Sequence, residues 1–206
     1  VCAAIYMVEY AKRGNKLVKL VRLTAETLQG IPSIVYGIFG YVCFNVALHC
    51  GFSMLAGALT LSIMILPLIL RTTEEALMAV PDSYREGSFG LGAGKLRTVF
   101  RIVLPSAMPG VLAGVILAIG RIVGESAALI YTSGSGTGNL SFIKNGAFSL
   151  AAPLFQSTRT LSVHMYALMS EGLYTDQAHA TAVILMVLVI GLNALSSFAA
   201  KKLTKQ

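Results

Sequence analysis

Residues 27–70 read TLQGIPSIVYGIFGYVCFNVALHCGFSMLAGALTLSIMILPLIL, a run of 44 residues without a formal charge. A helix of that length would measure about 66 Å, more than twice the roughly 30 Å hydrocarbon core of a membrane. The stretch therefore predicts two crossings, near Ile31–Leu48 and Phe52–Leu70, with the reversal at His49–Gly51. It decides the fold class, because a buried core of a soluble domain does not need two consecutive runs of this length.

Two further apolar segments follow, from about Ser106 to Ile130 and from Ala180 to Phe198. The chain is thus expected to be an all-α, polytopic helical membrane protein with about four complete spans. Its first apolar run, Val1 to Val8, is too short to span, and the sequence opens with Val instead of Met. We therefore expect a chain truncated at its N-terminus that begins with the end of an earlier span.

The composition agrees with a membrane protein. Of the 206 residues, 55% are hydrophobic and only 12% are charged, whereas about a quarter of a soluble domain is charged. The composition therefore argues against an autonomous soluble enzyme. The net charge of +7 would suggest nucleic acid in a soluble protein, so the placement of the basic residues must decide.

The basic residues alternate with the predicted crossings. Thirteen of the sixteen Lys and Arg lie before the first crossing, between the second and third, or after the last. Only Lys144 and Arg159 lie between the third and fourth. Because Lys and Arg are retained on the cytoplasmic side, 71–105 and the C-terminus are predicted to be cytoplasmic and 131–176 extracytoplasmic. This accounts for the charge without nucleic acid and leaves Arg121 inside the third crossing.

The predicted extracytoplasmic segment has two parts. Ser133–Gly138 is rich in Gly and Ser and lacks the Lys and Ser/Thr of a phosphate-binding P-loop, so a flexible linker is expected there. Leu161, Met165 and Leu168 then follow at the spacing of an amphipathic helix, which we expect to lie at the membrane surface.

No residue pattern indicates catalysis or a metal. The three Cys are odd in number and the three His share no ligand spacing with them. Gly94-Lys95 is followed by Leu96, which breaks the Walker A pattern. We expect no catalytic residue, no metal and no cofactor, so any energy must come from another chain.

The predicted cytoplasmic segment, RTTEEALMAVPDSYREGSFGLGAGKLRTVFRIVLP from 71 to 105, is marked as structured. Pro81 is expected to end one helix, and Ser83 followed by Glu86 predicts a capping box that starts another. Four glycines then limit this second helix to about two turns. Such a helix can present Tyr84 and Phe89, with Leu91 beyond it, to a partner's groove. The alternative is a solvated loop.

This segment resembles the membrane subunits of bacterial ABC importers, whose signature is E-A-A, three residues, G, nine residues, I-x-L-P. Glu86 and Gly92 match at the correct spacing, and so do the last positions, while Gly87 and Ser88 replace the two alanines. The resemblance implies a coupling helix that sits in a cleft of the ATPase subunit. The residues it assigns to ATPase coupling are Ser83, Tyr84, Arg85, Glu86, Gly87, Phe89, Gly92, Ile102, Leu104 and Pro105.

Nearly the whole chain resembles the phosphate-importer permeases of the PstA family. The segments that carry this likeness are IPSIVYG at 31–37, RTTEEAL at 71–77, SYREG at 83–87 and GRIVGE at 120–125. The resemblance implies the ABC importer permease (MetI-like) fold of six spans, with 1–206 as an incomplete ABC transmembrane domain. It also implies four partners: a homologous PstC-like permease subunit, a PstB-like ATPase dimer, a periplasmic PstS-like phosphate-binding protein and membrane lipid.

Arg121 and Glu125 are the only charged residues within a predicted crossing. Centring Arg in a bilayer costs about 2.5 kcal/mol or more, which favours burial towards a pore or a partner. Four-residue spacing would put both side chains on one helical face, so that Glu125 masks the guanidinium until an anion takes its donors. The resemblance places both in the substrate pathway. The alternatives are a salt bridge to a partner subunit, or an Arg that reaches the outer headgroups.

Together these features predict a permease subunit of an ATP-driven importer that translocates inorganic phosphate across the cell inner membrane. Two alternatives remain open at this point. One is a permease for another oxyanion, such as sulfate or molybdate. The other is a non-transport membrane scaffold whose cytoplasmic loop recruits a soluble protein.

Overall fold

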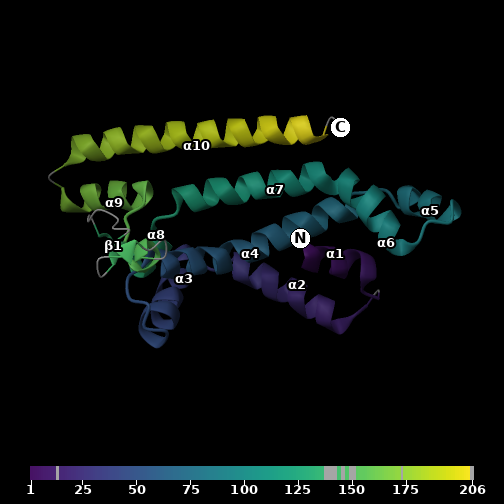
Figure 1. Ribbon diagram of the computed structural model, residues 1–206, viewed down its shortest axis with the longest axis horizontal. Coiled ribbons are helices and arrows are strands. Elements are labelled where there is room, and N and C mark those ends of the chain that lie inside the picture. The colour runs from purple at the N-terminus through teal and green to yellow at the C-terminus, as the bar shows by residue number, and fades with distance from the viewer. Residues whose placement is uncertain (13, 137–142, 145–146, 149–151, 173, 205–206) are drawn as a thin grey trace. The chain divides into compact units, whose positions relative to one another are not determined.

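The computed structural model is mostly helical and describes residues 1–12, 14–136, 143–144, 147–148, 152–172 and 174–204 (Figure 1). Its elements, with η for π-helical and 3-10 segments, are α1 Cys2–Ile5, η1 Tyr6–Tyr10, α2 Lys16–Gln29, α3 Ser33–Gly40, η2 Tyr41–Ala47, α4 Met54–Met78, α5 Asp82–Gly90, α6 Lys95–Thr98, η3 Val99–Val103, α7 Leu104–Gly124, α8 Ala127–Thr132, β1 Ile143–Lys144, β2 Ala147–Phe148, η4 Ala152–Phe155, α9 Leu161–Glu171 and α10 Thr175–Thr204.

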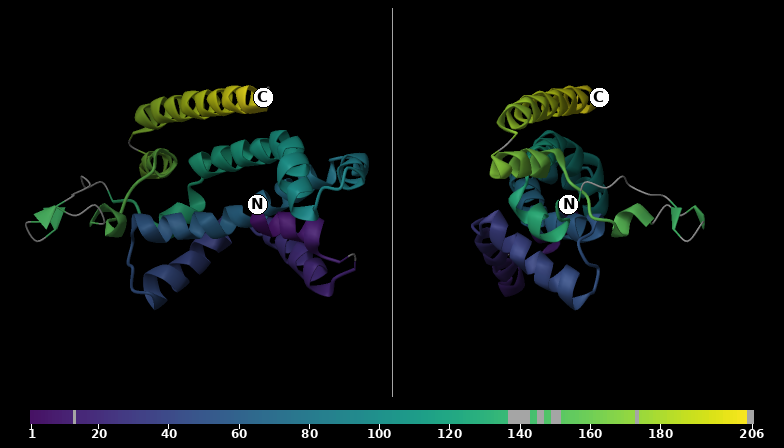
Figure 2. Two further views of the ribbon diagram at one scale, coloured as in Figure 1. Left: turned by 45° about the vertical axis from the view of Figure 1, so that its right-hand side comes forward. Right: turned by 90° about the vertical axis from the view of Figure 1, so that its left-hand side faces the viewer.

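Three helices in the described part of the chain are long and apolar enough to cross a membrane: α4, the continuous path Lys95–Gly124 and Thr175–Phe198 of α10. A fourth crossing results if α2 and α3–η2, on either side of the break at Gly30–Pro32, form one broken span. Two further views show α10 as a single uninterrupted helix (Figure 2). The helical membrane class predicted from the uncharged run is therefore confirmed.

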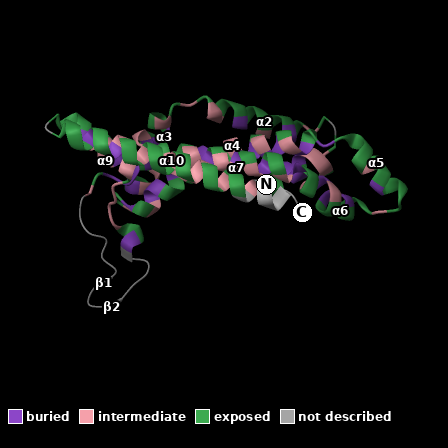
Figure 3. Ribbon diagram, turned by 90° about the horizontal axis from the view of Figure 1, so that it is seen from above, coloured by how far each residue is buried: buried purple, intermediate pink, exposed green. Residues whose placement is uncertain are grey.

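The long helices expose much of their apolar surface. Only 6% of the apolar window of α10 is buried within the chain, and exposed positions follow the helix along its length (Figure 3). Leu195 is 66% exposed and Phe198 is 69% exposed. A helix that is apolar around its circumference is suited to lipid or to another apolar helix rather than to water.

The first two predicted crossings are helical, but their bounds differ from the prediction. Ile31–Leu48 contains α3 and η2, whose 15 residues rise about 22 Å, which is too short to cross alone. The predicted reversal is confirmed, because His49 has φ 52° and Gly51 has φ 61°. The second helix, α4, runs eight residues beyond Leu70, to Met78, and its polar residues Thr73 and Glu74 are buried.

The third predicted crossing, from about Ser106 to Ile130, is confirmed as a long apolar helix, but its bounds differ in two respects. Its helical path starts at Lys95 and runs through the π-helical turn η3 into α7, with Pro105 as the second residue of α7. It also ends at Gly124, and a separate short helix, α8, follows. The fourth begins at Thr175, before its apolar part.

Contacts between Cα atoms divide the chain into two compact units, and each is described by itself. Unit 1 comprises 1–30, 66–119 and 193–206; unit 2 comprises 31–65 and 120–192. The buried core of unit 1 draws on α1, η1, α2, α4 and η3–α7, and consists of Ala4, Ile5, Met7, Val18, Ala25, Leu70, Leu77, Val80, Val99, Val103 and Ala107.

Within unit 1, α2 runs antiparallel to the second part of α4. Arg22 forms an ion pair with Glu74, and Gln29 Nε2 donates to the Pro67 carbonyl oxygen over 3.0 Å. Small residues also let α7 pack closely against α4. A Cβ on Gly110 would lie 2.7 Å from the Cβ of Ala76. Such contacts are typical of helices that pack closely in lipid.

Unit 2 packs α3 and η2 against α8. Asn45 Nδ2 donates to the Thr132 carbonyl oxygen over 3.1 Å, and Ser53 N donates to the same oxygen over 3.3 Å. A helix around Leu161 is confirmed as α9, which is capped by Thr160 and ends at Glu171, followed by Gly172 in the left-handed conformation; its position at the membrane surface stays a prediction. Residues 137–138 of the predicted linker lie outside the described residues, and the short β1–β2 pair was not predicted.

Candidate functional site

The first candidate site is α5, in unit 1. Asp82 opens the helix, with Pro81 at the N-cap position and no side-chain cap. The capping box predicted at Ser83 and Glu86 is therefore wrong, since Ser83 is already the second helical residue. Proline has a fixed φ suited to the start of a helix, and Asp82 in the first turn interacts favourably with the helix dipole, so the hydroxyl cap is unnecessary.

The end of α5 follows the glycine pattern. Leu91 N donates to the Gly87 carbonyl oxygen over 3.1 Å, and Gly92 N donates to the Phe89 carbonyl oxygen over 2.9 Å. Gly92 then takes φ +79°, the left-handed conformation that glycine adopts without steric cost. The prediction of a helix of about two turns between Pro81 and Gly92 is confirmed.

Several side chains of α5 and the following turn are exposed in this chain. Tyr84 is 52% exposed, Phe89 47% and Leu91 91%. Ser83, Glu86 and Gly87 are exposed as well, and we call these six residues the α5 surface. A surface with exposed large apolar and aromatic side chains is characteristic of a binding site for another protein.

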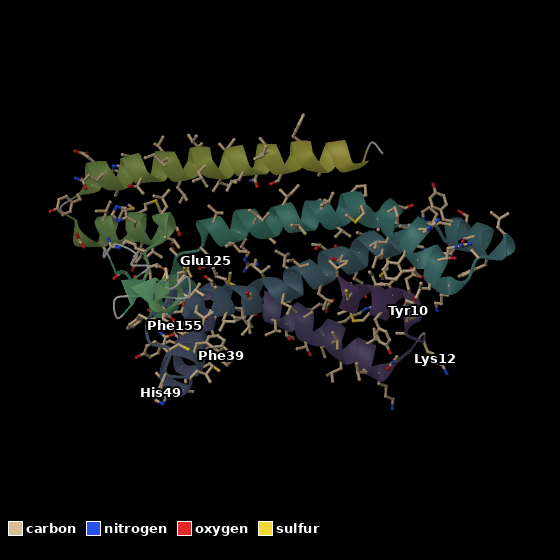
Figure 4. The ribbon with its side chains drawn as sticks, in the orientation of Figure 1. Tyr10, Lys12, Phe39, His49, Glu125 and Phe155 are labelled. Atoms are coloured by element: carbon tan, nitrogen blue, oxygen red, sulfur yellow. The ribbon has the colours of Figure 1, made fainter. Side chains whose placement is uncertain are left out.

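Contacts beneath α5 fix it on unit 1. The hydroxyls of Ser88 and Thr98 lie 2.8 Å apart and both residues are buried. The Lys95 ammonium lies 5.1 Å from the ring centroid of Tyr10, which Figure 4 labels on η1. Tyr84 also borders a cavity of about 370 Å³ between the end of α4 and the start of α7.

The last three motif positions lie at the junction of η3 and α7 and not on the α5 surface. Ile102 and Leu104 are partly buried, and Pro105 is exposed. Val103 between them is fully buried in the core of unit 1. These residues are therefore placed to stabilise the packing of the helical segment that connects α6 to α7.

Arg85 directly precedes the motif and was assigned to ATPase coupling with it, but its side chain turns into the protein. Its Nη2 donates to Glu9 Oε1 over 2.7 Å, and its side chain is only 15% exposed. Sequence reasoning grouped Arg85 with the exposed residues and missed Glu9 altogether. The signal that could have found Glu9 is a single carboxylate beside the apolar run Val1–Val8.

The second candidate site is Arg121 and Glu125, in unit 2. Arg121 is exposed in the last turn of α7, while Glu125 follows the end of that helix, where Figure 4 labels it. Among the described residues, no ion pair joins the two. The predicted masking of Arg121 by Glu125 on one helical face is therefore wrong, because α7 ends at Gly124 and four-residue spacing no longer aligns them.

Glu125 instead organises the break between the two helices. Its Oε1 accepts a hydrogen bond from Ala128 N over 3.2 Å, which caps the start of α8. Its backbone carbonyl oxygen accepts from Ser162 Oγ of α9 over 2.7 Å. The Arg121 guanidinium is thus left without a carboxylate partner in the part of the chain that the structure describes, and an anion can occupy its donors.

Unit 1 also contains an open cavity of about 720 Å³ that sequence reasoning did not anticipate. Lys12 and Lys19 line it together with Arg85 and Glu9. Within the described residues, no group of three or more His, Cys, Asp or Glu is placed to hold a metal ion.

The chain is similar to known membrane transport proteins in both sequence and fold. Residues 1–205 match the family model described as binding-protein-dependent transport system inner membrane component. Over 209 residues the chain is 37% identical to the probable ABC transporter permease protein YqgI of Bacillus subtilis, covering 97% of this chain and 71% of that protein. A chain of the inward-facing MetNI methionine ABC transporter superposes with a TM-score of 0.71 at 19% identity, covering 98% of this chain and 85% of that one, which shows the fold.

Phosphate permeases are among the relatives. The chain is 43% identical over 134 residues to the phosphate transport system permease protein PstA 2 of Mycobacterium bovis, covering 65% of this chain and 44% of that protein. It is 41% identical over 133 residues to PstA of Yersinia pestis, again covering 65% of this chain and 44% of that protein. The matched segment thus spans less than half the length of these PstA relatives.

Proposed function

The chain belongs to the family of binding-protein-dependent transport system inner membrane components, and from this premise we propose that it translocates inorganic phosphate as a permease subunit of an ATP-driven importer. It is an ABC importer permease and a multi-pass inner-membrane protein. The identity with PstA proteins supports phosphate as the substrate.

The observation that carries the proposal is the α5 surface. A short helix that presents Tyr84, Phe89 and Glu86 outward, on a base fixed by buried contacts, suits a rigid contact with another protein. We propose that this contact is with the ATPase subunits, PstB-like chains that hydrolyse ATP. In this arrangement 71–105 lies in the cytoplasm, as does the C-terminus, while 131–176 faces a PstS-like binding protein.

Arg121 supports the choice of an anionic substrate. An arginine at the end of an apolar helix that pairs with no carboxylate among the described residues has donors that match phosphate geometry. We propose that Arg121 contacts phosphate in transit, in a pathway formed together with a PstC-like permease. Glu125 contributes to this pathway by stabilising the break between α7 and α8 that follows Arg121.

The experiment is transport by the full complex in liposomes. The complete permease is co-expressed with its genomic neighbours, purified, reconstituted and supplied with ATP and radiolabelled phosphate. ATP-dependent uptake of phosphate that excess sulfate and molybdate do not inhibit is the expected result. Inhibition by either ion would reassign the substrate, and ATPase activity that phosphate and the binding protein leave unchanged would support the scaffold interpretation.

A further inference from the structure

Arg85 lies where three segments of unit 1 meet. From α5 it reaches the end of α4 and the π-helical turn η1, which is 76 residues earlier in the chain. Both members of its pair with Glu9 are largely buried, with side-chain exposures of 15% for Arg85 and 8% for Glu9. An ion pair withdrawn from water to this degree is costly unless its hydrogen bonds are complete.

The hydrogen bonds of Arg85 are complete. Nε and Nη2 both donate to Glu9 Oε1, over 3.1 and 2.7 Å. Nη1 donates to Asp82 Oδ1 over 3.1 Å and to the Val80 carbonyl oxygen over 2.7 Å, and Nη2 also donates to the Leu77 carbonyl oxygen over 3.0 Å. A guanidinium has five N–H donors, so these contacts leave none for another chain.

Two of these contacts close the end of α4. The last carbonyl groups of a helix have no intrahelical partner and carry partial negative charge. Leu77 supplies one such carbonyl, and Val80 supplies a further carbonyl two residues beyond the end of the helix; the guanidinium from α5 donates to both. The chain between α4 and α5 is only Ala79–Pro81, so the guanidinium closes a short and rigid corner.

We propose that Arg85 is a positioning residue that joins α5, the end of α4 and η1 into one rigid body. A displacement of the α5 surface then moves α4, instead of only bending the connection Ala79–Pro81. The proposal rests on the function proposed above. It separates Arg85 from the residues of the α5 surface, since Arg85 acts through α4 and touches neither the ATPase nor phosphate. Glu9 is the partner of Arg85 on η1, because its Oε1 accepts from both Nε and Nη2 and so orients the guanidinium.

Lysine cannot replace arginine in this role. Its ammonium is a point charge with three donors and lacks the planar fork that reaches two backbone carbonyls and a carboxylate together. Arg85→Lys therefore keeps the charge of the buried pair while removing the geometry. Lys19→Gln is the matched control, because Lys19 is an exposed cation of the same unit and forms no ion pair among the described residues.

The first test measures coupling in the reconstituted complex, as phosphate molecules transported per ATP hydrolysed. In Arg85→Lys and Glu9→Gln complexes the ATPase still co-purifies, and the ratio falls roughly two- to thirtyfold, the range for mutations along a coupling network. A purely structural role would lower the yield of complex and leave the ratio unchanged. A ratio equal to that of wild type and Lys19→Gln overturns the proposal.

The second test needs no transport, so it separates this proposal from the proposed function. Spin labels are placed on Met78, which is exposed, and on Gly90, where an added Cβ would have no described atom within 4 Å, after Cys2, Cys43 and Cys50 are replaced by serine. The wild-type complex should give one narrow distance distribution and Arg85→Lys a broad one. An equally narrow distribution in Arg85→Lys overturns the proposal, whereas absent phosphate uptake by the wild type overturns only the proposed function.

Discussion

Gly37 of α3 lies directly against the backbone of Ala128 in α8: a Cβ atom added to Gly37 would come within 2.9 Å of the Ala128 Cα. The neighbouring atom belongs to the main chain, so it cannot turn aside as a flexible side chain does. Two elements of unit 2 that are far apart in the sequence are thus held at the closest approach their backbones allow.

Gly37→Ala should destabilise unit 2. Relief of the contact requires a backbone shift, and overpacking of this kind costs about 1–3 kcal/mol. The melting temperature of the purified complex measures the effect. It is determined from the fraction of complex that still elutes intact from a sizing column after heating. Gly191→Ala is the control, because a Cβ there meets no atom in the described chain. Equal melting temperatures for the two variants would refute the close contact.

Arg121→Gln should reduce phosphate uptake roughly ten- to hundredfold, the value of hydrogen bonds to a charged group, while the complex still assembles. Uptake of radiolabelled phosphate, normalised to the amount of complex pulled down, measures this. Arg159→Gln is a control that removes a cation bonded to Ser135 and His164. Normal uptake by Arg121→Gln would remove Arg121 from the mechanism. Arg121→Lys shows whether charge alone suffices.

Glu125→Ala should lower stability by about 0.5–2 kcal/mol, the usual cost of removing a helix cap. Glu125→Gln should be close to wild type in stability, because its amide oxygen can still accept from Ala128 N. Melting curves of the two variants separate these outcomes. If glutamine were as harmful as alanine, the negative charge and not the acceptor would be what the break requires.

Gly92→Ala should weaken co-purification of the ATPase. A Cβ at φ +79° is strained by about 1–2 kcal/mol, and the strain falls at the end of α5. Gly14→Ala is the matched control. Gly14 has φ +87°, and a Cβ added at Gly14 or at Gly92 would have no described atom within 4 Å, but Gly14 lies outside 71–105. Both variants should fold alike, and only Gly92→Ala should lose ATPase. Glu86→Ala should lose it as well.

A similar loss of ATPase in the Gly14→Ala complex would show that strain anywhere in unit 1 suffices. That result would refute a specific contact at α5. Retention of ATPase by both Gly92→Ala and Glu86→Ala would do so too.

The sequence predicted the features that depend on local composition. The uncharged run before Arg71 gave helices on both sides of His49, and the glycines after Glu86 gave the length of α5. These are signals that a residue carries with its immediate neighbours, through apolar length and backbone freedom.

Features that depend on distant residues were not predicted. The break at Glu125 lies in a stretch as apolar as a continuous helix, and it is fixed partly by Ser162, which is 37 residues later. Arg85 has the same appearance in the sequence as its exposed neighbours, and only Glu9 shows that it is buried. Hydrophobic periodicity contains no information about such partners, since they meet only when the chain has folded.

The near absence of burial along α10 has a consequence for the cell. A helix that gains so little from its own chain is held in place by whatever surrounds it after synthesis. A newly made copy without its neighbours would display this helix to the membrane proteases that remove orphaned subunits. We therefore expect the abundance of the protein to follow that of its assembly partners, so that stoichiometry is set by degradation of the surplus.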